Sequence, residues 1–268
     1  MRRFVLGTSV AVLLAASTSY LRAQAFVTSH CDHDGNSFLN NARVCEVRTA
    51  TLPLVNGHLA VAGTNGSIAV TGEDRRDILL EAQVEAQAPT QAEAEALEHE
   101  IEILTNGEIH ADGPRSSGWS HKNWSVSYRL RVPRHLAAHL HTENGSVKLV
   151  DLDGAITAET TNGSMTLTDL AGDVNAHTVN GSLHVSLQGN QWRGGGLSAR
   201  TTNGSVSVSA AADYSAHLVG DTTNGSVHVG LPVAAQGRIR NHIDTNIGQG
   251  GSTLRFETVN GSLHVDRI

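Results

Sequence analysis

The densest group of potential ligands in the chain is the run HCDHDG, which begins at His30. Thiolate, imidazole and carboxylate groups are all ligands for transition metals. However, the chain has two cysteines, Cys31 and Cys45, and both follow a predicted export signal, so we expect them to reach an oxidising compartment. A bridge between them would contribute about 3 kcal/mol by restricting the unfolded chain. We therefore predict a Cys31–Cys45 disulfide, with no bound metal or cofactor.

Three of the fifteen histidines, His184, His228 and His264, recur at one position of a sequence repeat. Stacked imidazoles along an outer strip could hold a transition metal. Lysine, threonine and serine occupy the same position in the other copies, so the histidines do not form an unbroken row of metal ligands. A solvated polar face is the preferred interpretation, and metal binding in the envelope is kept as an alternative hypothesis.

Four acids, Asp151, Asp153, Asp169 and Asp173, come nearest to an acidic catalytic cluster. Glycoside cleavage requires two carboxyl groups that flank one bond, whereas these four fall mostly at expected turns and out of register. The sequence also lacks the hydrolase elbow, zinc-protease, P-loop and dinucleotide-binding motifs. We predict that the protein is not an enzyme. The alternative is a carbohydrate-binding or carbohydrate-cleaving solenoid.

The first 25 residues have the pattern of a secretory signal peptide. Arg2 and Arg3 precede an apolar run from Phe4 to Ala16, and Ala23-Gln24-Ala25 is a small-x-small cleavage signal. Removing this segment with its three arginines lowers the formal charge from −7 to −10. We expect a protein exported to the periplasm, the outer cell surface or the medium, with no transmembrane segment in the mature chain. Its acidity and lack of a basic run argue against nucleic acid as a partner.

The sequence Asn-Gly-Ser recurs along the chain, first at Asn65 and then from Asn144 onward in steps of 18, 18, 23, 21 and 36 residues. Self-similarity at a near-constant period is the signature of a repeat architecture. Because the last step is twice 18, we expect a degenerate copy around His242. The predicted repeat turns are Asn144, Gly145, Asn162, Gly163, Asn180, Gly181, Asn203, Gly204, Asn224, Gly225, Asn260 and Gly261.

Apolar and polar residues alternate on both sides of each of these turns. In all six copies from Asn144 onward, threonine stands two residues before the asparagine, and apolar residues stand six before, three after and five after it. This period of two predicts a strand on each side of the turn with one buried face. In the copy at Asn162, for example, Met165 and Leu167 should point inward and Thr166 outward.

Two all-β architectures fit this unit. Asn-Gly between alternating strands is typical of a type I′ turn, which would give an array of antiparallel hairpins. The preferred prediction is a parallel β-solenoid with coils of about 18 residues, because stacking explains why every turn repeats the same residues. Asparagine above asparagine and threonine above threonine would then form hydrogen-bonded ladders about 4.8 Å apart. The turn glycines would supply positive φ angles.

We divide the chain into a signal peptide (1–25), a cysteine-containing N-terminal segment (26–50), a strand-rich lead-in with one helix (51–133) and the T-x-N-G-S repeat region (134–268). Thr90 and Glu93 form a capping box that predicts the start of the helix. Trp119 and Trp124 flank a Gly/Ser-rich loop, where they could stack on a sugar but are more often expected to cover a strand end.

The lead-in reads NGSIAVTGEDRRDILLEAQVEA, then an Ala/Glu-rich helix and a strand ending in VP, and the T-x-N-G-S repeats follow. This order resembles an adhesin-like β-strand-repeat family of bacterial envelope proteins, a family of unknown biochemical function, over Thr51 to Ile268. The resemblance implies an exported, solenoid-like protein with no catalytic residues to carry over. We therefore expect an adhesin or scaffold role, with a cell-surface polysaccharide or an envelope protein as partner.

Overall fold

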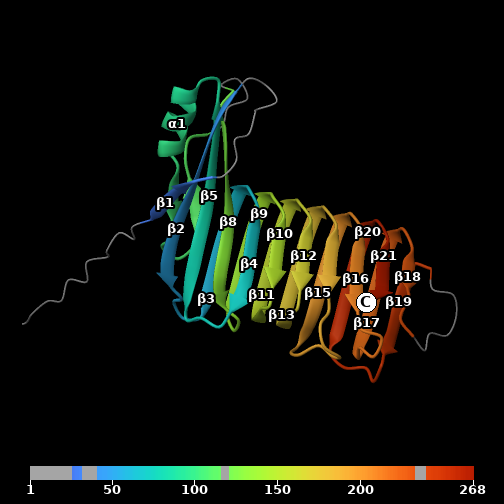
Figure 1. The fold of residues 1–268 in the computed structure, drawn as a ribbon. Coiled ribbons are helices and arrows are strands. Elements are labelled where there is room, and N and C mark those ends of the chain that lie inside the picture. Colours follow the sequence, from blue (N-terminus) through green and yellow to red (C-terminus); the bar gives the residue numbers. More distant parts are fainter. Residues whose placement is uncertain (1–25, 32–40, 116–120, 233–239) are drawn as a thin grey trace, which may run out of the picture.

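The computed structural model describes residues 26–31, 41–115, 121–232 and 240–268. The predicted signal peptide, the end of the HCDHDG run and Trp119 lie outside these ranges. The described residues form two large sheets and one small one, with the large sheets facing each other across the core (Figure 1). No helix among the described residues is long or apolar enough to cross a membrane.

Within the described ranges, seven coils form the stack, and each contains one strand in each large sheet. The strand before the Asn-Gly turn belongs to the eight-stranded sheet, in β3 (His58–Asn65), β9 (Ala137–Asn144), β11 (Asp153–Asn162), β13 (Ala171–Asn180), β15 (Gly196–Asn203), β17 (Ala216–Asn224) and β20 (Thr253–Asn260). The strand after it belongs to the eleven-stranded sheet, in β4 (Ile68–Glu73), β10 (Val147–Val150), β12 (Met165–Thr168), β14 (Leu183–Ser186), β16 (Val206–Ala210), β18 (Val227–Val229) and β21 (Leu263–Arg267). Coil strands pair in parallel, with the turn asparagines in register. The predicted parallel solenoid is confirmed, and the alternative of antiparallel hairpins is wrong.

Side chains alternate between the core and the outside as the sequence predicts. Met165 and Leu167 are buried, whereas Thr166 between them is partly exposed. The interior is continuous from coil to coil, because the equivalent apolar positions of neighbouring coils lie side by side in register. Each coil thus completes the core of the next, which a single coil could not do for itself.

The turns require glycine because neighbouring coils pack closely there, and not, as predicted, because the residue needs a positive φ. Only the first of them, Gly66, has a positive φ. A Cβ atom on Gly163 would lie 2.0 Å from the carbonyl oxygen of Gly145, and the other turns behave alike. The predicted threonine ladder is also different in detail. Thr160 donates its hydroxyl to the Gly145 carbonyl at 2.9 Å instead of to another threonine.

The last two coils do not stack in chain order. The coil of β20 and β21 lies between that of β15 and β16 and that of β17 and β18. The expected degenerate coil around His242 is wrong, because β19 (His242–Ile247) pairs antiparallel with β17 at the edge of the eight-stranded sheet. The longer sequence step before Asn260 therefore contains the edge strand β19 and the segment that leads from it back to β20, between β15 and β17.

An N-terminal module precedes and partly interrupts the stack. Its elements are β1 (Val27–His30), β2 (Ala42–Pro53), β5 (Asp77–Ala88), α1 (Gln91–His99), β6 (Glu102–Leu104), β7 (His110–Asp112) and β8 (Asn123–Pro133). The long strands β2, β5 and β8 pair antiparallel, and β8 joins the stack by parallel pairing with β4. Figure 1 shows the helix and the far ends of these strands projecting beyond the stack. Thr90 caps α1 by accepting a hydrogen bond from the Glu93 backbone.

Candidate functional site

The predicted repeat turns form one continuous column on the edge of the stack. The Asn162 amide donates to Asn144 Oδ1 at 2.8 Å and accepts from Asn180 Nδ2 at 2.9 Å. The same bond joins every neighbouring pair of coils, from Asn65 at one end to Asn224 at the other. These asparagines bond to one another, so within the column their role is structural.

The outer face of the eight-stranded sheet carries two adjoining grooves. One, of about 340 Å³, crosses β13, β15 and β20, and the other, of about 240 Å³, crosses β11, β13 and β15. Both are lined by Asn175, Ser198 and Arg200, and Asp173 and Arg255 extend the first. We call this surface the sheet groove. Polar side chains border it continuously across four neighbouring strands.

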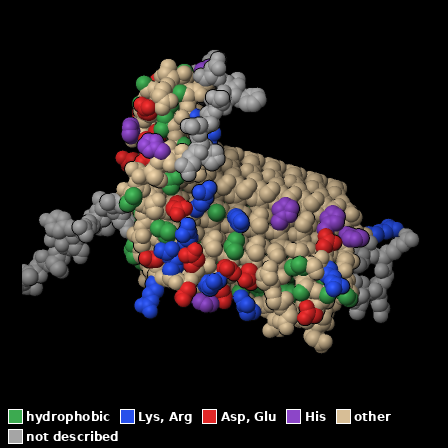
Figure 2. Space-filling view, viewed as in Figure 1, with side chains coloured by type: hydrophobic (Ala, Val, Ile, Leu, Met, Phe, Trp, Pro, Cys, Tyr) green, Lys and Arg blue, Asp and Glu red, His purple; other side chains and the backbone are tan. Residues whose placement is uncertain are grey.

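Charged side chains around the sheet groove form ion pairs both between neighbouring strands and within one strand. Arg200 lies 2.9 Å from Glu257, which also contacts Arg255 at 3.4 Å. Acidic and basic side chains are also intermixed on the face of the molecule drawn in Figure 2, beside a broad surface without charged groups. Because the charges are locally balanced, the sheet groove favours a partner with many hydroxyl or amide groups over a highly charged one.

The three aligned histidines do not meet as a group. His228 and His264 are neighbours, with ring centroids 6.3 Å apart. His184 is separated from His264 by strand β16, which carries Ser207 at that position. Among the described residues, no three histidine, cysteine or acidic side chains are placed to hold a metal ion.

Two of the four aspartates are in register after all. Asp151 and Asp169 occupy equivalent positions in neighbouring coils, both with positive φ. Their mutual hydrogen bond, with help from Arg134 at 3.1 Å, lowers the pKa of Asp151, whereas burial and the neighbouring Asp151 raise the pKa of Asp169. Asp153 instead pairs with His135 at 3.4 Å, and Asp173 borders the sheet groove. The Asp151–Asp169 pair lines neither of the two hollows of that groove, so it does not face a polymer bound there.

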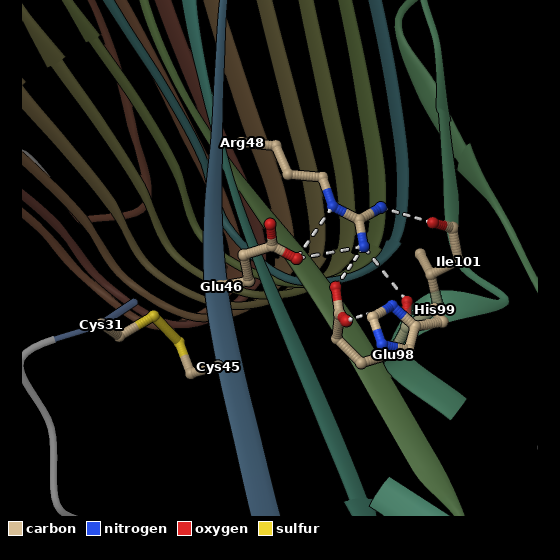
Figure 3. Close-up of polar contacts among 7 residues, drawn as sticks. All are labelled: Cys31, Cys45, Glu46, Arg48, Glu98, His99 and Ile101. Atoms are coloured by element: carbon tan, nitrogen blue, oxygen red, sulfur yellow. Dashed lines mark hydrogen bonds and ion pairs between the residues drawn. A yellow bond between two sulfur atoms is a disulfide. The ribbon is translucent and has the colours of Figure 1, made fainter. Parts of the chain in front are cut away.

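A buried ion cluster joins the helix to strand β2 in the N-terminal module (Figure 3). The Arg48 guanidinium pairs with the carboxylate of Glu98 and donates to the backbone carbonyls of Glu98 and Ile101. It also lies 3.5 Å from Glu46. Burial raises the pKa of Glu98, whose exposure is only 3%, and Glu46 beside it adds to the rise.

The pKa of Glu46 moves in the opposite direction. Burial alone would raise it, but a hydrogen bond with Glu98 and the charge of Arg48 outweigh burial and lower it. Arg48 thus holds two acids and the end of α1 in a single contact set, which we call the Arg48 clamp. All of its donors are directed at protein acceptors, so the geometry is that of a structural tie.

The two cysteines lie next to the Arg48 clamp. Cys31 and Cys45 are joined by a disulfide that ties β1 to β2, with their Cα atoms 5.5 Å apart (Figure 3). Both thiols are therefore occupied, which removes the sulfur ligand from the alternative metal site. A polar cavity of about 430 Å³ lies between this bridge and the helix.

No motif in the sequence marks Asn175, Ser198 or Arg200. Outward positions vary from coil to coil, so no recurring letter marks them. The period itself is the signal that could have found them, because Asn175 and Ser198 stand five residues before their turn asparagines and Arg200 stands three before. The Arg48 clamp and the cavity beside it are formed by contacts distant in sequence and have no such signal.

Comparison with known proteins found no match among curated proteins. Three solved bacterial structures are similar: a candidate cell adhesion protein from Clostridium sporogenes and candidate adhesins from Bacteroides fragilis and Parabacteroides distasonis, with identities of 13%, 11% and 13%. Each covers 83% of this chain, and 99%, 97% and 97% of the other chain, with TM-scores of 0.43, 0.37 and 0.34. Residues 134–266 match the Toastrack DUF4097 family. The family resemblance seen in the sequence is thereby confirmed, with the repeat region matching the model of the Toastrack DUF4097 family.

Proposed function

We propose that the protein is an exported, non-enzymatic, adhesin-like solenoid that binds a cell-surface polysaccharide along its sheet groove. The observation that carries this proposal is the continuity of the two hollows, which share Asn175, Ser198 and Arg200. Neighbouring strands lie about 4.8 Å apart. The groove therefore offers hydroxyl, amide and guanidinium groups at regular steps across the strands.

The shape of the groove favours an extended partner. Small ligands are usually held in pockets that bury most of their surface, whereas these hollows are shallow and open along the sheet. Affinity for a shallow surface must come from many weak contacts along a polymer. The in-register stack suits such binding because its backbone is already ordered, which limits the entropy lost on association.

A matched pair of variants tests the groove. The triple variant Asn175→Ala, Ser198→Ala and Arg200→Ala removes the shared side chains. The control Lys148→Ala, Thr166→Ala and Ser207→Ala changes three outward positions of the opposite sheet and also removes one positive charge. We expect co-sedimentation with bacterial cell-wall polysaccharide to fall at least tenfold for the groove variant and to be unchanged for the control.

Two results would count against this proposal. Equal binding by wild type and groove variant would place any polymer elsewhere, and release of sugars from the polysaccharide would show that the protein is an enzyme. Export is tested separately by fractionation and by mass spectrometry of the mature chain. A protein that stays in the cytoplasm with its first 25 residues attached would contradict the export part of the proposal.

A further inference from the structure

A second cavity lies at the N-terminal end of the stack, away from the sheet groove. Strand β3 is the last strand of the eight-stranded sheet, and its free edge is bridged by Ile109, which accepts from Ala62 N at 2.9 Å and donates to Ala60 O at 2.8 Å. Beyond this bridge, Gly63 to Asn65 border a cavity of about 200 Å³, which we call the end cavity. Its other walls include Trp124, Tyr128, Glu108, His110, His141 and Glu143.

Tyr128 gives the first sign that the end cavity holds a ligand. Its side chain is 1% exposed, and its hydroxyl has no hydrogen-bond partner among the described residues. Burial raises the pKa of this phenol further above its already high value, so the hydroxyl keeps its proton and remains a donor. A buried hydroxyl without a partner is costly, and proteins rarely retain one. The hydroxyl has less than 1 Å² of accessible surface, so a ligand in the end cavity provides the missing partner only once the cavity wall shifts slightly.

Asn65 gives the second sign. Along the asparagine column, each amide nitrogen donates to the asparagine of the neighbouring coil that lies nearer to Asn65, so all the bonds point the same way. Asn65 accepts from Asn144 Nδ2 at 3.0 Å but has no further asparagine to which it can donate. Hydrogen bonds in a chain polarise one another. The column therefore directs an amide donor at its open end, where Asn65 lines the end cavity.

Gly63 gives the third sign. It stands two residues before Asn65, where the six other coils have a threonine. A Cβ atom added to Gly63 would lie 3.2 Å from Thr142 Oγ1 and 3.6 Å from its Cβ, so a small side chain fits there once the Thr142 hydroxyl yields by a few tenths of an ångström. The missing side chain leaves space that belongs to the end cavity, because Gly63 is one of its lining residues. This is the one coil whose threonine position is empty.

The chemistry of the walls identifies the ligand class. Trp124 is half-buried, and its indole nitrogen donates to Pro114 O at 2.7 Å, which fixes the ring. Glu108 and Glu143 supply acceptors, and Asn65 and Tyr128 supply donors. The two carboxylates disfavour an anion, and so many polar groups disfavour an apolar molecule. An aromatic wall surrounded by both donors and acceptors fits a neutral polyhydroxylated ring.

We propose that the end cavity binds a single neutral sugar ring, the end residue of a glycan or a free monosaccharide. The cavity is smaller than the 300–1,000 Å³ typical of pockets for drug-sized ligands, which limits the ligand to one ring. Hydroxyl groups of the sugar accept from Tyr128 and Asn65 and donate to the carboxylates. This site does not depend on polymer binding at the sheet groove.

Saturation-transfer NMR and titration calorimetry with glucose, galactose, mannose and N-acetylglucosamine test the proposal. We expect at least one of these sugars to bind the wild-type protein. Tyr128→Phe should weaken that binding about tenfold while leaving the melting temperature unchanged or higher, because it removes an unsatisfied buried group. Tyr214→Phe, the same change in a buried tyrosine far along the stack, is the matched control and should bind like wild type.

A second variant fills the cavity. Gly63→Thr restores the residue found in the other coils and should abolish binding, with circular dichroism and melting used to check that the protein is folded. Failure of all four sugars to bind, or undiminished binding by Tyr128→Phe or by folded Gly63→Thr, would overturn the proposal. The groove variant should still bind monosaccharide, which separates failure at this site from failure of the proposed polymer binding.

Discussion

The stack and the N-terminal module are stabilised in different ways. In the stack, the same few contacts recur from coil to coil after the first: an asparagine bonded to an asparagine, a threonine to a glycine carbonyl, and glycine packed on glycine. In the module, each important contact occurs once, as in the Arg48 clamp and the Cys31–Cys45 bridge. A contact that recurs imposes the same residue at every copy and leaves a period in the sequence. A contact made once leaves no pattern.

The largest expected effect in the stack comes from a charge placed inside a coil. Leu167→Asp puts a carboxylate at a core position that is 1% exposed. Losing the buried leucine costs about 2–5 kcal/mol, and an unpaired buried charge costs more. We expect little or no folded protein by circular dichroism and denaturant titration. Thr166→Asp, one residue away but facing outward, should shift stability by less than about 0.5 kcal/mol. If both variants behave alike, the assignment of faces is wrong.

The turn glycines should be the next most sensitive positions. Gly163→Ala places a methyl group 2.0 Å from the Gly145 carbonyl oxygen, and both groups are backbone or directly attached to it. The neighbouring coils must separate locally, at a cost of about 3 kcal/mol in the free energy of unfolding. Gly230→Ala is the control, because its nearest atoms would lie 3.5 Å away. Similar denaturation midpoints for the two variants would contradict close stacking as the reason for glycine.

In the N-terminal module, removing the Arg48 clamp measures how much a single contact contributes to stability. Arg48→Met leaves the Glu98 carboxylate buried without its cation, which should cost about 2 kcal/mol after allowance for partial exposure of the cluster. The loss should be local. Hydrogen exchange should speed up in α1 and β2 and stay unchanged in β11 and β13.

The double variant Arg48→Met, Glu98→Met is the matched control for the clamp. It removes the unpaired Glu98 carboxylate as well as Arg48, so most of the lost protection from hydrogen exchange should return. Equal loss of protection in the module and the stack would show that the two regions unfold as one unit. That result would remove the distinction drawn between them.

This contrast also explains what the sequence could predict. Alternation and the recurring Thr-x-Asn-Gly-Ser identified the strands, the buried face and the parallel stack, because each coil repeats the same local geometry. The period did not predict that β20 and β21 lie between earlier coils, since equivalent coils can stack in any order. Nor did it place Asn65 in the column, because the inserted module separates it by 79 residues from Asn144.

The candidate sites were less predictable than the fold. Outward residues such as Asn175 and Arg200 are free to vary, so only their place in the period marks them as neighbours. The unpartnered hydroxyl of Tyr128 is a property of packing, and the sequence shows only a tyrosine in an alternating strand. The end cavity and this unsatisfied hydroxyl lie where the module interrupts the repeat, and there the period carries no information.

The smallest predicted effect tests whether the asparagine column acts as a chain or as separate bonds. Asn162→Ala breaks two amide bonds, and Asn65→Ala at the end of the column breaks one. Independent bonds would cost about 1 kcal/mol each, so the interior variant should lose about twice as much as the end variant. If the bonds polarise one another, the interior variant loses more than twice as much stability as the end variant, because it divides the chain of hydrogen bonds in two. Denaturant titration of both single variants and of the double variant decides between these cases. Equal losses at the two positions would mean that glycine packing, and not the amide column, holds the turn edge together.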